Sequence, residues 1–404
     1  MHAGVGYSDT PDTYAAGRQV ALDALKQGGL GRPCDLVLLF FTAAHEAGVL
    51  RDAVASVVGA GVPIVGGAAV GVISNERFGY AGDQIVLAAF WFEGARCDFL
   101  AEGGLKESEE ATGCRLGRRL AGLPEFSAAS SLMLFYDAID REDGRMRLVM
   151  ATPLIAGLER GLGFLPNLIG AGLQGDYAAS ATRQIAEREV VRHHALALSF
   201  SGAVTLDNVI MHGCRPGTGY FTVTKSDMQT VLEINGKPAL SFITSLLKNA
   251  LTPDELPFSL ILGVNRGKKW SRFDEKSYAN RLCLAVDKER DGLVMFEPDM
   301  VAGTEFQVMY RSFDLDYIPP RIEKTFADAE AAGRKPVFAL YIDCAGRAAG
   351  YAGTDLEDAL MVQKSVAGRV PLMGIYSGVE IAPVEGRPRG LDWTGVFCLF
   401  SVPR

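Results

Sequence analysis

Cys344 occupies a position that suits a nucleophile. It lies where an apolar run ends and a loop leads into the next helical pattern, a usual place for functional groups in α/β proteins. A catalytic thiol needs a lowered pKa and a neighbouring base. No histidine follows His212 in the sequence, so a Cys–His pair would have to form between distant parts of the chain. A Cys-dependent enzyme is therefore an alternative only, and we expect a protein without catalytic residues.

Arg347 and Glu380 form a second candidate pair. A guanidinium and a carboxylate that converge on one pocket would hold the carboxylate and the ammonium group of an amino acid. The competing interpretation is a salt bridge between the two side chains. With Cys344 they make up the polar part of a candidate ligand site in the C-terminal part of the chain.

Three of the five histidines lie close enough to basic residues to be candidates for cofactor binding. His193 and His194 are adjacent in an expected strand, so their side chains should point to opposite faces. His212 precedes the sequence Gly-Cys-Arg-Pro, where irregular backbone could bring an imidazole toward a ligand. For each of them the alternative is a structural histidine held by hydrogen bonds.

A glycine-rich phrase occurs three times, at residues 63–71 (PIVGGAAVG), 167–175 (NLIGAGLQG) and 371–378 (PLMGIYSG), and a strand-like run follows each copy. Glycine there indicates a positive-φ turn or a backbone that another group approaches closely. Each phrase is thus either a hairpin in a sheet or a place where a ligand rests on bare backbone. The second interpretation makes ligand-binding candidates of Gly66, Gly67, Gly170, Gly374 and Tyr376.

The composition indicates a packed globular protein of more than one core. The chain has 404 residues, of which 48% are hydrophobic and 22% charged. The net charge of -8 argues against nucleic acid as a partner, and no apolar run approaches the ~18 residues that span a bilayer. The N-terminus does not resemble a signal peptide, so we expect a cytoplasmic protein without membrane insertion. The seven scattered cysteines form no C-x-x-C motif, which disfavours a disulfide framework or a zinc site.

The periodicity predicts an α/β fold built from repeated strand–helix–strand–strand units. Three units contain the glycine phrases, with opening strands at 35–41, 131–136 and 336–342 and helices at 44–58, 146–162 and 354–366. A weaker unit is expected over 239–286, after a β-rich segment with a hairpin at 221–234. We predict two similar halves of mixed sheets covered by helices, with an N-terminal domain over 1–230 and a C-terminal domain over 231–404.

With these pieces placed, the chain resembles FIST-domain proteins, in which an N-terminal FIST module precedes its C-terminal partner. The matching stretches are 64–73 (IVGGAAVGVI), 168–176 (LIGAGLQGD), 212–216 (HGCRP), 232–240 (LEINGKPAL), 344–347 (CAGR) and 374–383 (GIYSGVEIAP). They occur in the family's order along nearly the whole chain.

The resemblance implies a ligand-binding sensor of signal transduction. Members without an output domain of their own are expected to report to a separate histidine kinase, as in two-component systems, or to a diguanylate cyclase or phosphodiesterase. Self-association into a homodimer is a further partner hypothesis. Amino acids are implied as ligands of the family, and one branch is implied to bind haem and sense nitric oxide.

The haem and nitric-oxide sensor is the most concrete form of this expectation. An axial ligand in an apolar pocket, with a basic residue near the propionates, is what haem requires. His212, His193 or His194 would be the axial ligand, Cys214 a lesser one, and Arg215 the basic neighbour. Where the family pattern carries polar residues in the first phrase, this chain has Ala68, Ala69 and Val72. This disfavours an amino-acid site in the N-terminal half, because a buried unpaired charge costs several kcal/mol or more.

Overall fold

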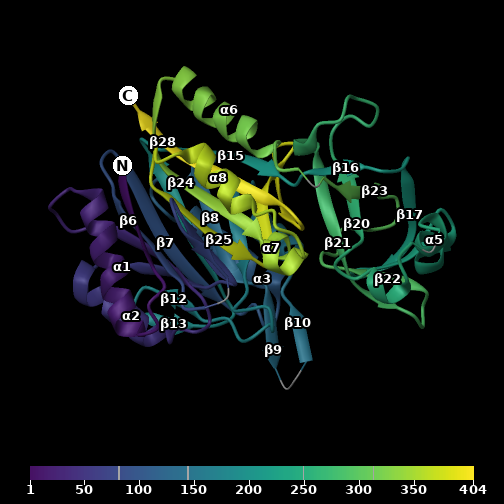
Figure 1. Cartoon of the computed structure of the whole chain (residues 1–404), viewed down its shortest axis with the longest axis horizontal. Helices are drawn as coiled ribbons and strands as arrows, with labels where there is room; N and C mark the ends of the chain where they lie inside the picture. Colours follow the sequence, from purple (N-terminus) through teal and green to yellow (C-terminus); the bar gives the residue numbers. More distant parts are fainter. Residues whose placement is uncertain (81, 143–144, 249, 313) are drawn as a thin grey trace.

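The computed structural model describes residues 1–80, 82–142, 145–248, 250–312 and 314–404. Figure 1 shows a larger α/β body, with sheets inside and helices outside, and a smaller β-rich body beside it. The α/β class predicted from the sequence is confirmed. In the described part of the chain, no helix combines the length and the apolar character that crossing a membrane requires.

The first sheet has the strand order β1-β6-β2-β3-β12-β13. Its strands are β1 (His2–Ser8), β6 (Ile85–Trp91), β2 (Leu36–Phe41), β3 (Ile64–Ala68), β12 (Gln184–Ala186) and β13 (Glu189–Val191), and its helices are α1 (Thr13–Gly28) and α2 (Ala47–Val58). Helix α1 begins where the Asp12 carboxylate accepts a hydrogen bond from the Ala15 amide (2.8 Å), and it ends at Gly29 in the left-handed conformation (φ 67°).

The second sheet has the order β7-β14-β8-β11-β26-β27. Its strands are β7 (Ala95–Gly103), β14 (His194–Gly202), β8 (Ser131–Asp137), β11 (Asn167–Leu173), β26 (Val379–Val384) and β27 (Arg387–Leu391), and its helices are α3 (Glu109–Ala121) and α4 (Ala151–Leu162). The predicted helix over 146–162 begins later than expected, because β10 (Arg145–Leu148) pairs with β9 (Ile139–Glu142) in a hairpin of its own.

The third sheet has the order β15-β28-β24-β25-β4-β5. Its strands are β15 (Thr205–Met211), β28 (Gly395–Pro403), β24 (Arg334–Cys344), β25 (Leu372–Ser377), β4 (Gly71–Ser74) and β5 (Phe78–Gly79), and its helices are α6 (Ile318–Ala331), α7 (Ala349–Ala352) and α8 (Asp358–Val366). The helix predicted at 354–366 begins at Asp358.

All three sheets follow one scheme, in which a hairpin from each unit pairs with the sheet of another unit. The hairpin that follows the glycine-phrase strand of one unit pairs antiparallel with the glycine-phrase strand of a different unit: β4 with β25, β12 with β3, and β26 with β11. The exchange is cyclic, so the three sheets enclose one core. Aromatic contacts join every pair of sheets there: Phe40–Phe135 (5.0 Å between ring centroids), Phe90–Phe338 (4.9 Å) and Phe200–Phe400 (5.3 Å).

The β-rich body is a barrel inserted into the third unit between β15 and α6. Pairing of β23 with β20 closes the strands into a ring. The strands are β16 (Cys214–Pro216), β17 (Phe221–Asp227), β18 (Thr230–Ile234), β19 (Lys237–Pro238), β20 (Ile261–Asn265), β21 (Tyr278–Asp287), β22 (Gly292–Met295) and β23 (Glu305–Arg311), with α5 (Ala239–Leu246) beside them. The predicted hairpin at 221–234 is confirmed.

The prediction that residues 239–286 form a further, weaker repeat of the unit was wrong, because the strands of this segment pair only within the barrel. The division into residues 1–230 and 231–404 stays a prediction about domain organisation. In the third sheet, β15 from before that division pairs with β28 from after it.

The first glycine of each phrase allows two parallel strands to approach closely. Gly66, Gly170 and Gly374 stand opposite Leu39, Leu134 and Tyr341 on the neighbouring parallel strand. A Cβ atom at these glycines would lie 1.9, 1.9 and 2.6 Å from the carbonyl oxygen of the opposite residue. These glycines serve the packing of backbone on backbone.

We predict that Gly170→Ala destabilises the protein by about 3 kcal/mol or more, since a backbone carbonyl in a sheet cannot move aside as a side chain can. Gly219→Ala is the matched control, because nothing lies within 4 Å of the Cβ atom it adds. That variant should change the free energy of unfolding by about 1 kcal/mol at most. Urea denaturation of both proteins measures the difference, and equal midpoints would contradict the close-approach explanation.

Candidate functional site

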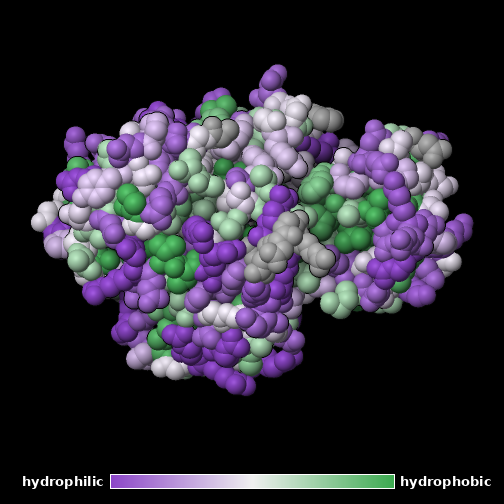
Figure 2. All heavy atoms as spheres, turned by 90° about the horizontal axis from the view of Figure 1, so that it is seen from below, coloured by the Kyte–Doolittle hydropathy of each residue, from purple (hydrophilic) through white to green (hydrophobic). Residues whose placement is uncertain are grey.

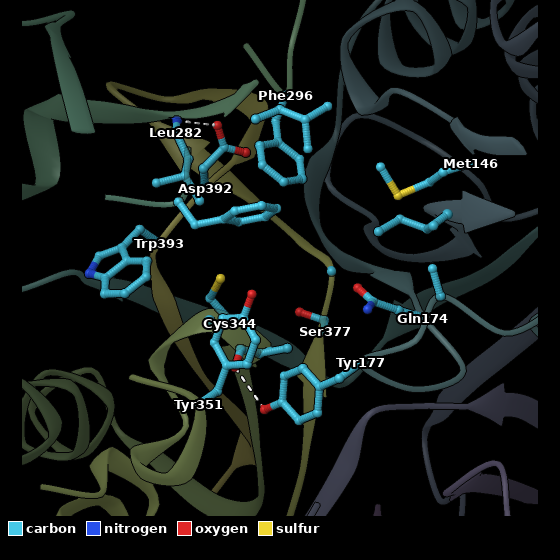
Figure 3. A pocket seen from close by; sticks show the side chains of 17 residues that line it. Met146, Gln174, Tyr177, Leu282, Phe296, Cys344, Tyr351, Ser377, Asp392 and Trp393 are labelled. Atoms are coloured by element: carbon cyan, nitrogen blue, oxygen red, sulfur yellow. Dashed lines mark hydrogen bonds between the residues drawn. The ribbon is translucent and has the colours of Figure 1, made fainter. Parts of the chain in front are cut away.

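A cavity of about 110 Å³ lies where the second sheet, the third sheet and the barrel meet. Figure 2 shows apolar side chains gathered where the barrel meets the larger body. The cavity wall is mostly apolar and aromatic, with a few polar side chains that converge on it (Figure 3). This combination is typical of small-molecule sites.

Three polar side chains enter the cavity from the ends of neighbouring strands. Cys344 ends β24 and stands opposite Ser377, which ends β25, while Gln174 directly follows β11. Figure 3 shows the Cys344 thiol, the Ser377 hydroxyl and the Gln174 amide directed inward. They meet because the glycine phrases of the second and third units end at the same edge of the molecule.

Asp392, between β27 and β28, is the acidic residue of the cavity wall. One carboxylate oxygen accepts a hydrogen bond from the Leu282 amide (2.9 Å). The other oxygen, Oδ1, is buried and accepts no hydrogen bond from any residue that the structure describes. Burial raises the pKa of Asp392 to about 7, and the partly opposing effect of the Arg281 guanidinium does not cancel this rise.

Trp393 follows Asp392 and holds an unusual backbone conformation. Its φ of 54° lies in the left-handed region, which a bulky side chain adopts only where its surroundings enforce it. The Arg311 guanidinium lies 4.9 Å from the centroid of its ring. The loop that carries Asp392 and Trp393 is thus held by the Leu282 amide on β21 and by the Arg311 side chain on β23.

Two tyrosines close another part of the wall. Tyr177 and Tyr351 stack with ring centroids 4.7 Å apart and planes 5° from parallel. The Tyr177 hydroxyl donates a hydrogen bond to the Ala345 carbonyl oxygen (2.9 Å), which joins the segment after β11 to the segment after β24. Both rings remain partly exposed, so this pair forms the outer part of the wall.

Arg347 is completely engaged in the protein itself. Its guanidinium pairs with Asp343 (3.2 Å) and Asp358, all of them buried. The remaining hydrogen bonds go to the Tyr317 hydroxyl (2.6 Å), the His212 carbonyl oxygen (2.8 Å) and the Trp393 carbonyl oxygen (3.3 Å). Burial raises the pKa of Asp343, the neighbouring Asp358 adds to the rise, and Arg347 opposes it.

Glu380 is equally enclosed, without a salt bridge to Arg347. Its carboxylate accepts hydrogen bonds from the Ser377 hydroxyl (2.9 Å) and the Thr394 amide (3.2 Å). Burial raises its pKa well above the ordinary value. Neither the amino-acid clasp nor the mutual ion pair considered from the sequence corresponds to these contacts. Tyr376 donates a hydrogen bond to Glu357 (2.7 Å).

Both ring nitrogens of His212 are used by the backbone. Nδ1 accepts a hydrogen bond from the Cys214 amide (2.9 Å), so Nε2 carries the proton and donates to the Glu275 carbonyl oxygen (3.2 Å). Burial lowers the pKa of His212, which keeps the ring neutral. A histidine with both nitrogens engaged offers no ligand to a metal, so the arrangement at His212 does not fit an axial haem ligand.

Two domain models match the chain, the FIST N domain over residues 35–237 and the FIST C domain over residues 239–383. The chain belongs to the FIST family. FIST domains are sensor domains of signal transduction that bind small ligands.

Relatives of this FIST chain include two proteins described only as uncharacterized. One, from Mycobacterium tuberculosis, is 25% identical over 414 residues, which cover 99% of this chain and 100% of the relative. Another, from Mycobacterium bovis, is 26% identical over 239 residues, or 58% of this chain and 60% of the relative. A solved cyanuric acid hydrolase from A. caulinodans covers 50% of this chain and 71% of its own at 13% identity, and its TM-score of 0.26 is too low to support an argument.

The other histidines predicted as ligands lie near the start of β14 in this FIST chain. The Asp137 carboxylate accepts a hydrogen bond from the His193 amide (2.6 Å), and the His193 ring lies 3.9 Å from the same oxygen. Nδ1 of His194 lies 2.7 Å from the Arg192 carbonyl oxygen. Neither residue is part of the cavity wall described above.

Cys214 and Arg215 are also away from the cavity. Cys214 is buried beside His212, and Arg215 lies over the Phe273 ring at 5.7 Å from its centroid. Within the described residues, no group of three His, Cys, Asp or Glu side chains is arranged to hold a metal ion.

Of the predicted ligand-binding residues, the structure places Cys344 in the cavity wall and the others elsewhere. Gly66, Gly67, Gly170, Gly374 and Tyr376 lie within buried strands, and Arg347 and Glu380 lie behind the wall. The sequence interpretation did not identify Asp392, Trp393, Gln174, Tyr177 and Tyr351 as site residues. The one local signal was an acid and a tryptophan side by side, just before the largely apolar strand β28.

We predict that Arg347→Met lowers the free energy of unfolding by about 3–5 kcal/mol, because it leaves Asp343 and Asp358 buried without their cation. Asp358→Asn in the same chain should restore part of the loss. Arg215→Met replaces an exposed arginine and should change stability by about 0.5 kcal/mol or less. Urea denaturation of the four proteins tests this, and an Arg347→Met loss as small as that of Arg215→Met would contradict it.

Proposed function

We propose that this FIST protein is a sensor that binds a small molecule in the cavity between the second sheet, the third sheet and the barrel. The observation that carries the proposal is the convergence of polar groups from distant parts of the chain, Gln174, Cys344, Ser377 and Asp392, on one apolar enclosure. A ligand there contacts the barrel and the α/β body at once. Binding would therefore favour one relative placement of these two parts, and this difference is what a partner protein reads.

We infer that the cavity binds its ligand without chemical conversion. Burial raises the pKa of the Cys344 thiol well above its ordinary value, and the Glu380 carboxylate adds to the rise. A thiol in this state is a poor nucleophile. No histidine is found among the described residues of the cavity wall to act as its base.

The partner classes stay predictions from the family resemblance: a histidine kinase, or a diguanylate cyclase or phosphodiesterase. The net negative charge of the chain gives no preference between them. Pull-down experiments with and without a cavity ligand would compare how strongly each candidate partner binds. A sensor should bind its partner differently in the two states.

Haem binding with nitric-oxide sensing, expected from the family resemblance, is the hypothesis that competes with our proposal. Our proposal expects instead that hemin added to the protein gives only broad, non-saturating absorbance, unchanged in His212→Ala. A sharp Soret band that shifts with nitric oxide and disappears in His193→Ala or His194→Ala would establish haem binding and contradict this expectation.

The cavity proposal is tested by blocking the cavity. Leu284 lies in the wall and is half-buried. Leu284→Trp should therefore fill the space with little strain. We expect metabolite screening by thermal shift to find compounds that stabilise the wild-type protein, and we expect Leu284→Trp to lose at least tenfold in affinity for them.

Leu22→Trp is the control, because Leu22 is exposed on α1, away from the cavity wall. This variant should bind as the wild type does. Ligands that bind equally to Leu284→Trp would place the sensor site elsewhere.

A further inference from the structure

We propose that the ligand of this cavity is an organic ammonium ion with a small apolar body, and that the Asp392 carboxylate holds its charge. This inference rests on the proposed function and adds the chemical class of the ligand. It differs from the amino-acid hypothesis in one respect that can be measured: the ligand carries a cation and no carboxylate.

The first argument is the free oxygen of Asp392. Its Oδ2 is bonded to the Leu282 amide, whereas Oδ1 is buried in the cavity wall without a partner among the described residues. Figure 3 shows this second oxygen directed away from the hydrogen bond to Leu282. A buried acceptor without a donor is costly. An ammonium group supplies both the missing donor and the opposite charge.

The charge of Arg281 acts on Asp392, but this cation does not supply the missing hydrogen bond. The Arg281 guanidinium is fully buried, but its Nε and Nη2 bind Asp299 at 2.5 and 2.6 Å. Its Nη1 donates to the carbonyl oxygens of Asn280 and Gly390. These contacts direct Arg281 to Asp299, so Asp392 keeps an oxygen for a ligand.

The second argument is the charge of the wall as a whole. Among the described residues that line the cavity, Asp392 is charged and none is Lys, Arg or His. An anionic group would find no partner here and would face a carboxylate. Arg347, the cation expected to hold a ligand carboxylate, is turned toward Asp343, Asp358 and backbone oxygens.

The third argument is the shape and character of the remaining wall. Aliphatic side chains from β9, β10 and β21 line it, namely Ile139, Met146, Leu282 and Leu284. The rings of Phe296 and Trp393 also line it, and aromatic faces attract cations as well as apolar groups. A volume of about 110 Å³ suits a body of a few carbon atoms.

The charge state of Asp392 gives the pH dependence. Because the pKa of Asp392 in the ligand-free protein is about 7, this side chain is ionised in most molecules at pH 8 and in few at pH 6. An alkylamine stays protonated over this range. Affinity should therefore fall about tenfold from pH 8 to pH 6, following the ionised fraction. The charged and titratable groups that face Asp392 are Arg281 on β21, Glu297 and Asp299 after β22, Glu380 on β26 and Tyr136 on β8.

The test uses four probes that share one carbon skeleton. Isoamylamine carries only the cation, leucine adds a carboxylate, isocaproate carries only the carboxylate, and isoamyl alcohol is neutral. Calorimetry at pH 8 should show saturable binding of isoamylamine at millimolar concentration or below. Leucine should bind at least tenfold more weakly, and isocaproate should not bind.

Asp392→Asn keeps the size of the side chain and an acceptor for the Leu282 amide but removes the charge. We expect it to fold and to bind isoamylamine at least tenfold more weakly than the wild-type protein. The fall in wild-type affinity between pH 8 and pH 6 is a second measurement that needs no variant.

Three results would overturn the inference: binding of isoamylamine that is unchanged in Asp392→Asn, equal or tighter binding of leucine or isocaproate, or no binding of isoamylamine. If another ligand then bound the wild type and not Leu284→Trp, the proposal of a sensor cavity would stand. Only the inference of an ammonium ligand would be wrong. Isoamylamine that binds Leu284→Trp as well as it binds the wild type would bind outside the cavity and would remove the ammonium inference. The sensor cavity would be removed as well if every stabilising compound of the screen bound Leu284→Trp equally.

Discussion

The buried guanidinium of Arg347 is the interaction on which the candidate site depends. It joins five separate parts of the chain, through Asp343, Asp358, Tyr317 and the carbonyl oxygens of His212 and Trp393. Burying such a group is favourable only when nearly all of its donors are satisfied, as they are here. Since one of these bonds holds the backbone of Trp393, Arg347 also fixes the loop that presents Asp392 to the cavity. Its contribution to the site is therefore to position other residues.

The cyclic exchange of hairpins explains why the cavity lies where it does. The β26–β27 hairpin of the third unit pairs with β11 of the second, so the residue that follows it, Asp392, lines the same cavity as Gln174. The barrel inserted after β15 then covers this edge with Leu282 and Leu284. No single unit contains the site. For a sensor this has a consequence, because a ligand at the junction can bias the placement of whole units and needs no flexible lid to do so.

Local patterns in the sequence predicted the repeated units, and the position of Cys344 at a strand end followed from them. The sequence indicated correctly that another group approaches these glycines closely. That group is the backbone of a neighbouring strand and not a ligand. What the sequence could not provide was the pairing between units. Asp392 looks like an ordinary turn residue until β26 and β21 are placed around it. For Arg347 the sequence suggested a ligand or Glu380 as the partner, because the carboxylate of Asp358 reaches it only through the packing of α8 on the third sheet.

Two adjacent residues of the site are held in states that lower the stability of the protein and that the fold alone does not require. Asp392 keeps a buried carboxylate oxygen without a donor, and Trp393 holds a positive φ that costs about 1–3 kcal/mol for a residue with a large side chain. Ordinary turn residues, such as a glycine or an asparagine at position 393, would relieve the second cost. Both unfavourable features lie in one loop that faces one cavity. Locally unfavourable structure of this kind is expected at a binding site, where the rest of the fold supplies the stability. The strain is compensated by the Arg347 network behind the loop, and the unpaired oxygen is the part left for a ligand to complete.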